Sequence, residues 1–271
     1  MISVFGGTGF ILGRFCEMFS GHVNIIDRES RVPKDSTVLY GISTTHNYNK
    51  LSADISTNIG VLSEVLENLN GDHKFIFLSS WFVCAKSDLP NNEQMDFDAP
   101  TGNYSFTKYL AEQLVRTYCS SNDIPYIILR IANVFGDGDN FSKQKNALQY
   151  LVNEMRNGRD IELYNDGLFY RDYIHVDSAC RGMFLLGTLA PENEIYNLGS
   201  GRAILFSDLI YVAHRLLNSK SEITSCDPGE FHQKVQVKDF FFDINKTLNA
   251  VGHSWLDSPY EKFVEMVLDE S

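Results

Sequence analysis

The segment "VFGGTGFILG", residues 4–13, decides the fold of this chain. A strand-like lead runs into Gly6, Gly7 and Gly9, and a helix-like stretch follows them. In a nucleotide-binding strand-turn-helix unit, such glycines let the backbone approach a pyrophosphate, which faces the unpaired N–H groups of the helix N-terminus. Leu12 stands where the third glycine of this fingerprint belongs. Because that glycine serves helix packing rather than phosphate contact, we expect a bound dinucleotide and a Leu12 side chain that fills a gap beside a displaced helix.

Length and composition narrow the class of protein. With 271 residues and 44% hydrophobic content, the chain can form one core with an appended lobe. No run approaches the roughly 18 apolar residues of a membrane span, and a strand follows Met1 almost at once, so we expect a cytoplasmic protein without a leader or membrane contact. The five cysteines are scattered, which favours free thiols over disulfides or a metal site. A net charge of -12 argues against nucleic acid as a partner.

Short apolar runs alternate with helix-like stretches, which is the rhythm of a parallel sheet covered by helices. The expected strands lie near residue 2 and at 23–27, 37–43, 74–80 and 126–134, and the expected helices lie at about 9–19, 54–69 and 101–121. We therefore predict an α/β, Rossmann-type doubly wound domain over residues 1–136, which also receives elements from about 168–200. Residues 137–271 form a smaller, mostly helical and discontinuous substrate lobe in this prediction.

An acidic residue stands where the ribose of a dinucleotide is expected. Asp27 closes the second strand and follows Gly6 by about 20 positions, the spacing at which a carboxylate accepts hydrogen bonds from the adenosine ribose. A carboxylate there also repels a 2'-phosphate, which favours NAD over NADP. Arg28 beside it weakens that preference.

A second constellation indicates what the cofactor is for. In "NYSFTK", Tyr104 and Lys108 stand four positions apart on one face of a predicted helix, and the strand 74–80 ends at Ser80. Strand ends in such sheets point into the ligand crevice. A tyrosine with an ordinary pKa of about 10 is a poor base at neutral pH. A lysine ammonium and an oxidised nicotinamide, both positive, can lower that pKa.

With these motifs in order, the chain resembles the extended short-chain dehydrogenases/reductases of the NAD-dependent nucleotide-sugar epimerase/dehydratase family over nearly its full length. The stretches that carry the resemblance are "GGTGFIL", "FIFLSSWFV", "PTGNYSFTKYLAEQL", "LRIANVFGDGD", "GLFYRDYIHVDS" and "YNLGSGRAILFSDLI".

The resemblance implies a role for each matching residue. Tyr104 would be the acid/base, Ser80 would hydrogen-bond the sugar hydroxyl, and Lys108 would hold the nicotinamide ribose and lower the tyrosine pKa. The predicted cofactor site comprises Gly6, Gly7, Thr8, Gly9, Phe10, Ile11, Asp27, Arg28, Ser43, Asn58, Tyr104 and Lys108. The predicted substrate site comprises Ser80, Trp81, Phe82, Asn133 and Arg171, the last two on the nucleotide diphosphate. No metal is expected.

Several of these residues have a second interpretation. Asn58 could be a mid-helix polar residue that faces solvent, and Arg171 could form a surface salt bridge with Asp172 or Asp177. His175 is expected to be structural. Trp81 and Phe82 could wall the sugar pocket or pack in the core.

Departures from the family pattern narrow the function. Relatives that dehydrate a sugar carry an Asp-Glu pair directly after the serine, and this chain has Trp81-Phe82 there, which argues against a dehydratase. We therefore expect an NAD-dependent nucleotide-sugar epimerase acting at C4. The alternatives are a nucleotide-4-keto-sugar reductase using NAD(P)H and an NAD-binding regulator without catalysis. The resemblance also implies a homodimer formed through the helices that carry Asn58 and Tyr104.

Two further departures concern the nucleotides. The segment "RESRVPKDS", residues 28–36, is too short, and with Pro33 too broken, for the helix and strand that the family has there. We therefore expect a sheet one strand short and an unusual adenine pocket. No arginine follows Arg215, so Lys234 or His232 would have to replace the family's late phosphate-binding arginine.

Overall fold

The computed structural model describes residues 1–44, 50–84, 89–94, 102–138, 146–235 and 237–269. Its centre is a parallel sheet of six strands in the order β10-β5-β4-β3-β1-β2. The strands are β1 (Ile2–Phe5), β2 (Val23–Ile25), β3 (Thr37–Tyr40), β4 (Lys74–Ser80), β5 (Tyr126–Ile131) and β10 (Glu194–Leu198). Every residue of β5 is buried, as expected for a strand that is covered on both faces.

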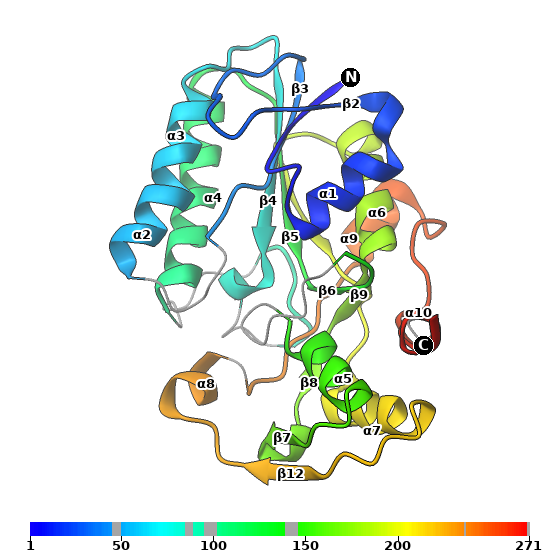
Figure 1. The fold of residues 1–271 in the computed structure, drawn as a ribbon. Helices are drawn as coiled ribbons and strands as arrows, with labels where there is room; N and C mark the ends of the chain where they lie inside the picture. The colour runs from blue at the N-terminus through cyan, green and yellow to red at the C-terminus, as the bar shows by residue number, and fades with distance from the viewer. Residues whose placement is uncertain (45–49, 85–88, 95–101, 139–145, 236, 270–271) are drawn as a thin grey trace.

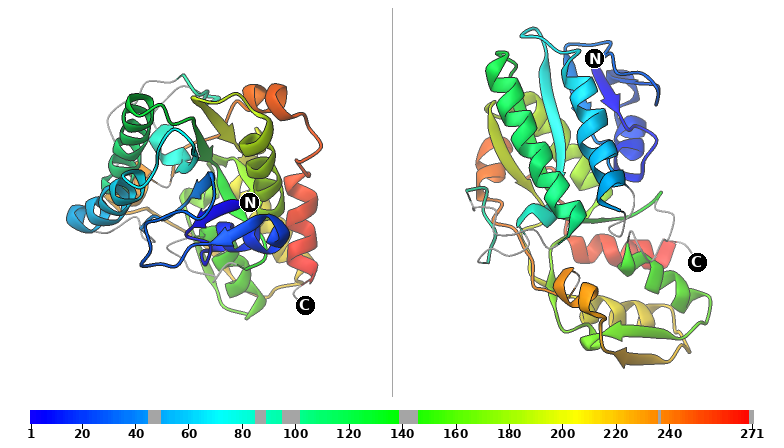
Figure 2. Two further views of the ribbon diagram at one scale, coloured as in Figure 1. Left: turned by 90° about the horizontal axis from the view of Figure 1, so that it is seen from above. Right: turned by 90° about the vertical axis from the view of Figure 1, so that its left-hand side faces the viewer.

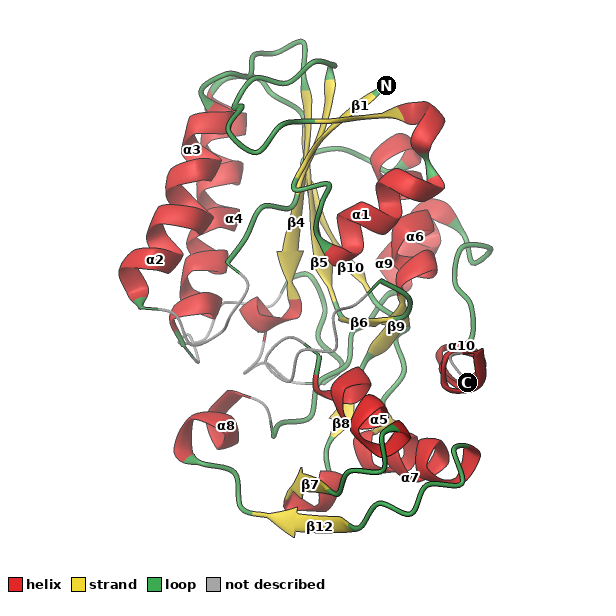
Figure 3. Ribbon diagram, in the orientation of Figure 1, coloured by secondary structure: helices red, strands yellow, loops and turns green. Residues whose placement is uncertain are grey.

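Helices cover both faces of this sheet (Figures 1 and 3). One face carries α1 (Phe10–Met18), α6 (Val176–Leu189) and α9 (Asn245–Val251), and the other carries α2 (Leu51–Ile55), α3 (Val61–Leu66) and α4 (Asn103–Ser121). Each layer has its own apolar core. The chain leaves β1 for β2 and returns to β3 on the other side of β1. Ligands of doubly wound sheets bind at the carboxyl ends of the strands flanking such a switch point.

The elements follow the sequence pattern with two local differences. The stretch expected as one helix over 54–69 is α2 and α3 joined by a single π turn, Ser56–Gly60. The stretch expected as one strand over 126–134 ends at Ile131 in the main sheet. It continues as β6 (Asn133–Phe135), which pairs with β9 (Tyr173–His175) outside that sheet.

Residues 26–36, all of which the structure describes, contain no strand, so the expectation of a shortened sheet is confirmed. Asp35 fixes the segment 26–36, which connects β2 to β3, against the sheet. Its carboxylate accepts hydrogen bonds from Ser3 Oγ at 2.9 Å and from Asn24 Nδ2 at 3.0 Å, which ties the connection to β1 and β2.

A smaller lobe lies beyond the carboxyl ends of the strands (Figures 1 and 2). Its elements are α5 (Ala147–Arg156), β7 (Ile161–Tyr164), β8 (Tyr170–Arg171), β11 (Ile204–Leu205), α7 (Phe206–Leu216), β12 (Ile223–Cys226), α8 (Glu230–Val235) and α10 (Pro259–Asp269). Most of them surround a third apolar cluster. Among the described residues, no helix is both long and apolar enough to cross a membrane.

Candidate active site

The glycine turn leaves the N-terminus of α1 open. Gly6 has a φ of +92°, which favours glycine, and its carbonyl accepts a hydrogen bond from the Gly9 amide at 3.1 Å. Gly9 is the N-cap of α1 and offers no side chain to the first amides of the helix, which stay available for an anion. Thr8 and Gly9 are exposed.

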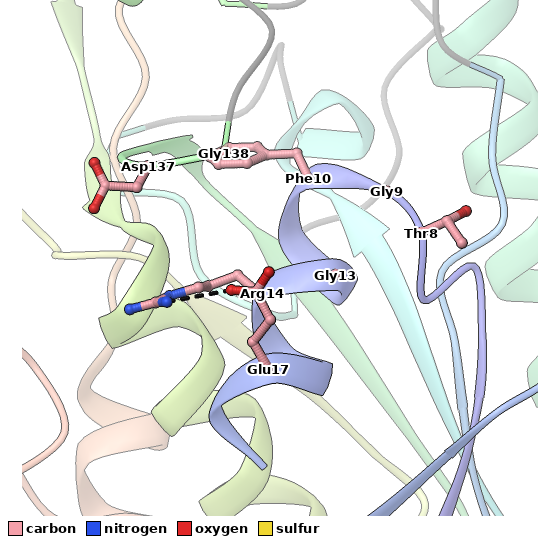
Figure 4. Close-up of a pocket in the computed structure, with 8 residues that line it drawn as sticks. All are labelled: Thr8, Gly9, Phe10, Gly13, Arg14, Glu17, Asp137 and Gly138. Carbon is pink, nitrogen blue, oxygen red and sulfur yellow. Dashed lines mark hydrogen bonds and ion pairs between the residues drawn. The ribbon is translucent and has the colours of Figure 1, made fainter. Parts of the chain in front are cut away.

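A cavity of about 360 Å³ opens beside this turn (Figure 4). Figure 4 shows Phe10 on α1 extending toward Gly138, while Arg14 and Glu17 line the wall one turn further along the helix. The lining residues are Thr8, Gly9, Phe10, Gly13, Arg14, Glu17, Asp137 and Gly138. Arg14 Nε donates to Asp177 Oδ1 at 2.6 Å, and this bond fixes that wall to α6.

Leu12 is buried, with 3% of its surface exposed, and packs against a glycine of the sheet. A Cβ atom at Gly41, the residue after β3, would lie 2.4 Å from Leu12 Cδ1. The fingerprint would have a glycine on the helix at this contact. Here the helix has Leu12, and the glycine, Gly41, stands on the opposing strand end. As expected, the Leu12 side chain fills the space between the two.

The predicted ribose residues stand at the end of β2. The Ile26 amide donates to the Val4 carbonyl at 3.0 Å and continues the pairing with β1. Asp27 follows it and is exposed, and its Oδ1 accepts a hydrogen bond from the Glu29 amide at 2.9 Å. Arg28 is also exposed. The Asp27 carboxylate has further lone pairs that this hydrogen bond does not use.

Asn58 lies in the π turn and is only 2% exposed, so the solvent-facing interpretation is wrong. Its Oδ1 accepts from Ser43 Oγ at 3.0 Å and from the Thr44 amide at 2.9 Å. Its Nδ2 donates to Thr107 Oγ1 on α4 at 2.9 Å. Single π turns are frequent at functional sites, and this one joins the end of β3 to the helix that carries Tyr104.

Tyr104 and Ser80 come together as the sequence predicts. The Tyr104 hydroxyl lies close to the Ser80 hydroxyl at the end of β4 and to the Ser43 hydroxyl after β3. Burial raises the pKa of Tyr104, the two serine hydroxyls lower it, and Asp54 raises it. The Phe82 ring meets the tyrosine edge-on at 5.6 Å between centroids.

Lys108 is 3% exposed, and its Nζ donates to the Leu78 carbonyl of β4 at 2.8 Å. Its ammonium also lies 4.4 Å from the centre of the Phe77 ring. Burial lowers the pKa of Lys108 to about 8, and the charge of Glu112 opposes that change. Ser43 and Ser80 are the groups that lower the pKa of Tyr104.

Arg171 is 4% exposed, so it does not form the surface salt bridge that was its alternative. Its guanidinium carbon lies 4.9 Å from the Trp81 ring centre and 5.1 Å from that of Phe169. Burial lowers the pKa of Arg171 to about 10. Trp81 is buried and stacks on Phe82 and Phe240 at 4.0 and 4.6 Å.

The remaining candidates lie on the lobe side. Asn133 Nδ2 donates to the Asp172 carbonyl at 3.2 Å. His175 is the N-cap of α6 and accepts from the Asp177 amide at 3.3 Å, which is a structural role. The His232 ring lies 4.8 Å from that of Tyr164, and the Lys234 side chain lies outside the described residues. Within the described part of the chain, no cluster of His, Cys, Asp and Glu has the makings of a metal site.

Sequence reasoning missed three residues around the site. Gly41 receives Leu12, and Glu112 lies next to Lys108 in the core. Asp172 ties the lobe to the sheet, accepting from the Ser200 amide and hydroxyl and from the amides of Gly201 and Phe242. Only Glu112 carried a signal, since it follows Lys108 by four positions on one helix face.

One curated relative is similar to this chain over about three quarters of its length. The chain is 27% identical over 204 residues to a dTDP-4-dehydro-6-deoxyglucose reductase of Escherichia coli, a match that covers 73% of this chain and 62% of that protein. The chain thus spans less than two thirds of the length of that relative.

Two solved structures share the fold over almost the whole chain. A UDP-glucose 4-epimerase from Thermotoga maritima with UDP-glucose has a TM-score of 0.88 at 20% identity and covers 99% of this chain and 97% of its own. A UDP-glucuronic acid 4-epimerase from Bacillus cereus in complex with NAD has a TM-score of 0.84 at 19% identity and covers 98% and 94%.

The family follows from a match across the centre of the chain. The model of the NAD dependent epimerase/dehydratase family matches residues 35–199, from just before β3 to just after β10. This range holds Ser80, Tyr104 and Lys108. Because it covers more than half of the chain, this protein belongs to the NAD dependent epimerase/dehydratase family.

Proposed function

We propose that this protein is an NAD-dependent nucleotide-sugar epimerase that acts at C4 of the sugar through a transient keto sugar. The observation that carries the proposal is the cluster of hydroxyl groups that Tyr104, Ser80 and Ser43 form. Ser80 and Ser43 stand at the carboxyl ends of β4 and β3, beside the switch point between β3 and β1, where the uncapped N-terminus of α1 also lies. An acid/base beside a dinucleotide site is the minimum that alcohol oxidation and ketone reduction require.

The residues around the turn fit NAD. Gly6, Thr8 and Gly9 leave the first amides of α1 open to a pyrophosphate, and Phe10 and Ile11 supply two of those amides. Asp27 would accept the ribose hydroxyls, and its negative charge disfavours a 2'-phosphate. Bound in this way, oxidised NAD would supply a hydride acceptor and a positive charge.

The chain's own groups handle the proton. Tyr104 as a phenolate takes the proton of the sugar C4 hydroxyl, while the Ser80 hydroxyl donates a hydrogen bond to the same oxygen. After the 4-keto sugar presents its other face, Tyr104 returns the proton to that oxygen and the inverted hydroxyl forms. Since burial raises the pKa of Tyr104, the phenolate depends on positive charge brought near it.

The diphosphate of the substrate would be held from the lobe side. Arg171 presents a guanidinium between two aromatic rings, and a guanidinium can bind two phosphate oxygens at once. Asn133 begins β6, which pairs with β9, and its side chain donates to the carbonyl of Asp172, the residue that follows Arg171. With the diphosphate held in this way, the sugar would extend toward Phe82 and Tyr104.

A panel of UDP-, dTDP-, GDP- and CDP-sugars tests the proposal. Incubation with the purified protein, followed by proton NMR, should show interconversion of C4 epimers without net change in the nicotinamide absorbance. Tyr104→Phe should lower the rate by roughly 1,000-fold because the acid/base is lost. Tyr118→Phe, on the same helix but away from Ser80, is the matched control and should retain activity.

A 4-keto-sugar reductase is the second candidate, and the relative from Escherichia coli favours it. It would consume one reduced nicotinamide per sugar, so absorbance loss with a nucleotide-4-keto sugar would replace the epimerase proposal with this one. If no sugar reacts and Tyr104→Phe alters nothing, the protein is an NAD-binding regulator instead.

We also propose a homodimer formed through α2 and α4. The two helices pack together, and α2 exposes Leu51 and Ile55 at 41% and 42%. Burial of such side chains in a helical bundle would stabilise the pair. Light scattering at micromolar concentration should give twice the chain mass, and Leu51→Glu with Ile55→Glu should give the monomer mass. We also propose a cytoplasmic location, because Cys16, Cys84, Cys119 and Cys180 are buried free thiols, as is usual in a reducing compartment.

A further inference from the structure

A buried network of charges stands behind Lys108 and takes no part in the mechanism above. Glu112 follows Lys108 by one turn of α4 and has no exposed surface. Its Oε1 accepts from Ser79 Oγ at 2.5 Å and from Arg130 Nε at 3.1 Å, and its Oε2 accepts from Arg130 Nη2 at 2.8 Å. Arg130, on β5, is itself only 6% exposed.

The network reaches both predicted catalytic elements. Ser79 directly precedes Ser80 on β4, so the hydrogen bond from Ser79 to Glu112 fixes the strand end that carries Ser80. Lys108 lies on the same helix face as Glu112 and contacts β4 through the Leu78 carbonyl. One carboxylate therefore links α4, β4 and β5 at the point where the acid/base machinery is anchored.

The groups around Lys108 show how the Glu112 carboxylate influences the charge of the lysine. On β4 the ammonium meets only the neutral Leu78 carbonyl and the Phe77 ring. On α2, the charge of Asp54 raises the pKa of Tyr104. On β5, the charge of Arg130 is paired with Glu112. Glu112 is the charged side chain that favours the protonated form of Lys108 against its burial.

We propose that Glu112, held in place by Arg130 and Ser79, is the positioning residue that keeps Lys108 charged in its buried site. The inference rests on the proposed function, in which the Lys108 ammonium would hold the nicotinamide ribose and bring positive charge near Tyr104. The hydrogen bonds of Glu112 exist without substrate. An ordinary ion pair in a core is often replaceable by apolar groups without loss of stability. The pair of Glu112 and Arg130 would instead be required to keep the neighbouring Lys108 protonated.

The test removes both charges together, because Glu112→Gln alone would leave Arg130 buried and unpaired. In the Glu112→Gln/Arg130→Gln variant of the full chain, the Lys108 side chain is titrated by NMR with ¹³C-labelled lysine and assigned with Lys108→Arg. Burial lowers the pKa of Lys108 to about 8 in the natural chain. In the variant it should fall by about one further unit. If the variant does not fold, Glu112→Met/Arg130→Met fills the same volume with apolar groups.

Rates provide a second readout that a merely structural role would not reproduce. At pH 8, kcat should fall about five-fold, because about half of Lys108 is charged in the natural protein and about a tenth in the variant. At pH 6, where Lys108 is charged in both, kcat should be equal within about two-fold. The salt bridge between Glu154 and Arg159, at the end of α5 in the lobe, provides the control, and Glu154→Gln/Arg159→Gln should change neither readout.

The outcomes separate this inference from the proposed function. An unchanged Lys108 titration, or an equal loss of kcat at both pH values, overturns the positioning role. If the natural protein converts no nucleotide sugar while the Lys108 titration still shifts, the proposed function fails and the charge relation holds.

Discussion

The glycine turn and the wall that carries Tyr104 are two parts of the candidate site, and they are built in opposite ways. At the turn, Thr8 and Gly9 are exposed, and no side chain caps the first amides of α1. At the wall, Asn58, Lys108 and Glu112 are all buried, and each makes hydrogen bonds to another element. The turn offers free backbone donors, whereas the wall holds side chains in fixed positions.

This difference between the turn and the wall predicts which substitutions should reduce stability or NAD binding most. A backbone-built anion site depends on how closely helix and strand approach, which is set here by Leu12 and Gly41. A side-chain-built wall depends on hydrogen-bond partners, because an unpaired buried polar group is destabilising. Four predictions test this contrast, from the largest expected effect to the smallest.

Asn58→Ala should have the largest effect on stability. It removes the partners of Ser43, Thr44 and Thr107, and we expect the free energy of unfolding to fall by about 3 kcal/mol. Urea unfolding measures this loss. Asn68→Ala, on the exposed end of the same helical segment, should change it by less than about 0.5 kcal/mol. Equal effects at both positions would remove the contrast between wall and surface.

Gly41→Ala should destabilise the protein by about 2 kcal/mol through overpacking, since its Cβ would lie 2.4 Å from Leu12 Cδ1. Adding Leu12→Ala should recover part of that loss, which thermal unfolding of both variants would show. Gly13→Ala is the matched control, because its Cβ would make only a 3.5 Å contact with the Gly7 carbonyl. Independent, additive effects at 12 and 41 would refute the paired packing.

Asp27→Ala should weaken NAD binding about ten-fold, the loss of one or two hydrogen bonds to a ribose. Calorimetric titration with NAD and NADP measures the change, and the preference for NAD should shrink at the same time. Glu29→Ala removes a neighbouring exposed charge and should leave both affinities nearly unchanged. The ribose assignment is wrong if NADP already binds the natural protein more tightly.

The pH dependence should show the smallest effect. Because burial lowers the pKa of Lys108 to about 8, the ammonium loses its proton as the pH rises through that value. The epimerisation rate should therefore be halved near pH 8 and fall further above it. Lys108→Arg keeps its charge at these pH values, so its remaining activity should show no such fall. A flat profile between pH 7 and 9 in the natural protein would contradict this prediction.

Much of the fold and part of the site follow from local sequence. Alternating apolar runs and helical stretches predict the parallel sheet, and the short segment 28–36 predicts its missing strand, because chain length limits what can form there. The motif around Tyr104 and Lys108 places two side chains on one helix face, and β4 spans residues 74–80, as the sequence pattern predicts.

Only the tertiary structure decided which distant residues complete the site. Gly41 is an ordinary glycine until Leu12 is packed on it, and Arg130 is one cation among 23 Lys and Arg residues until β5 places it against Glu112. Local patterns record the periodicity of a single element. The contacts between α1 and β3, and between α4, β4 and β5, arise from how elements far apart in sequence pack, and burial then sets the charge state of Lys108.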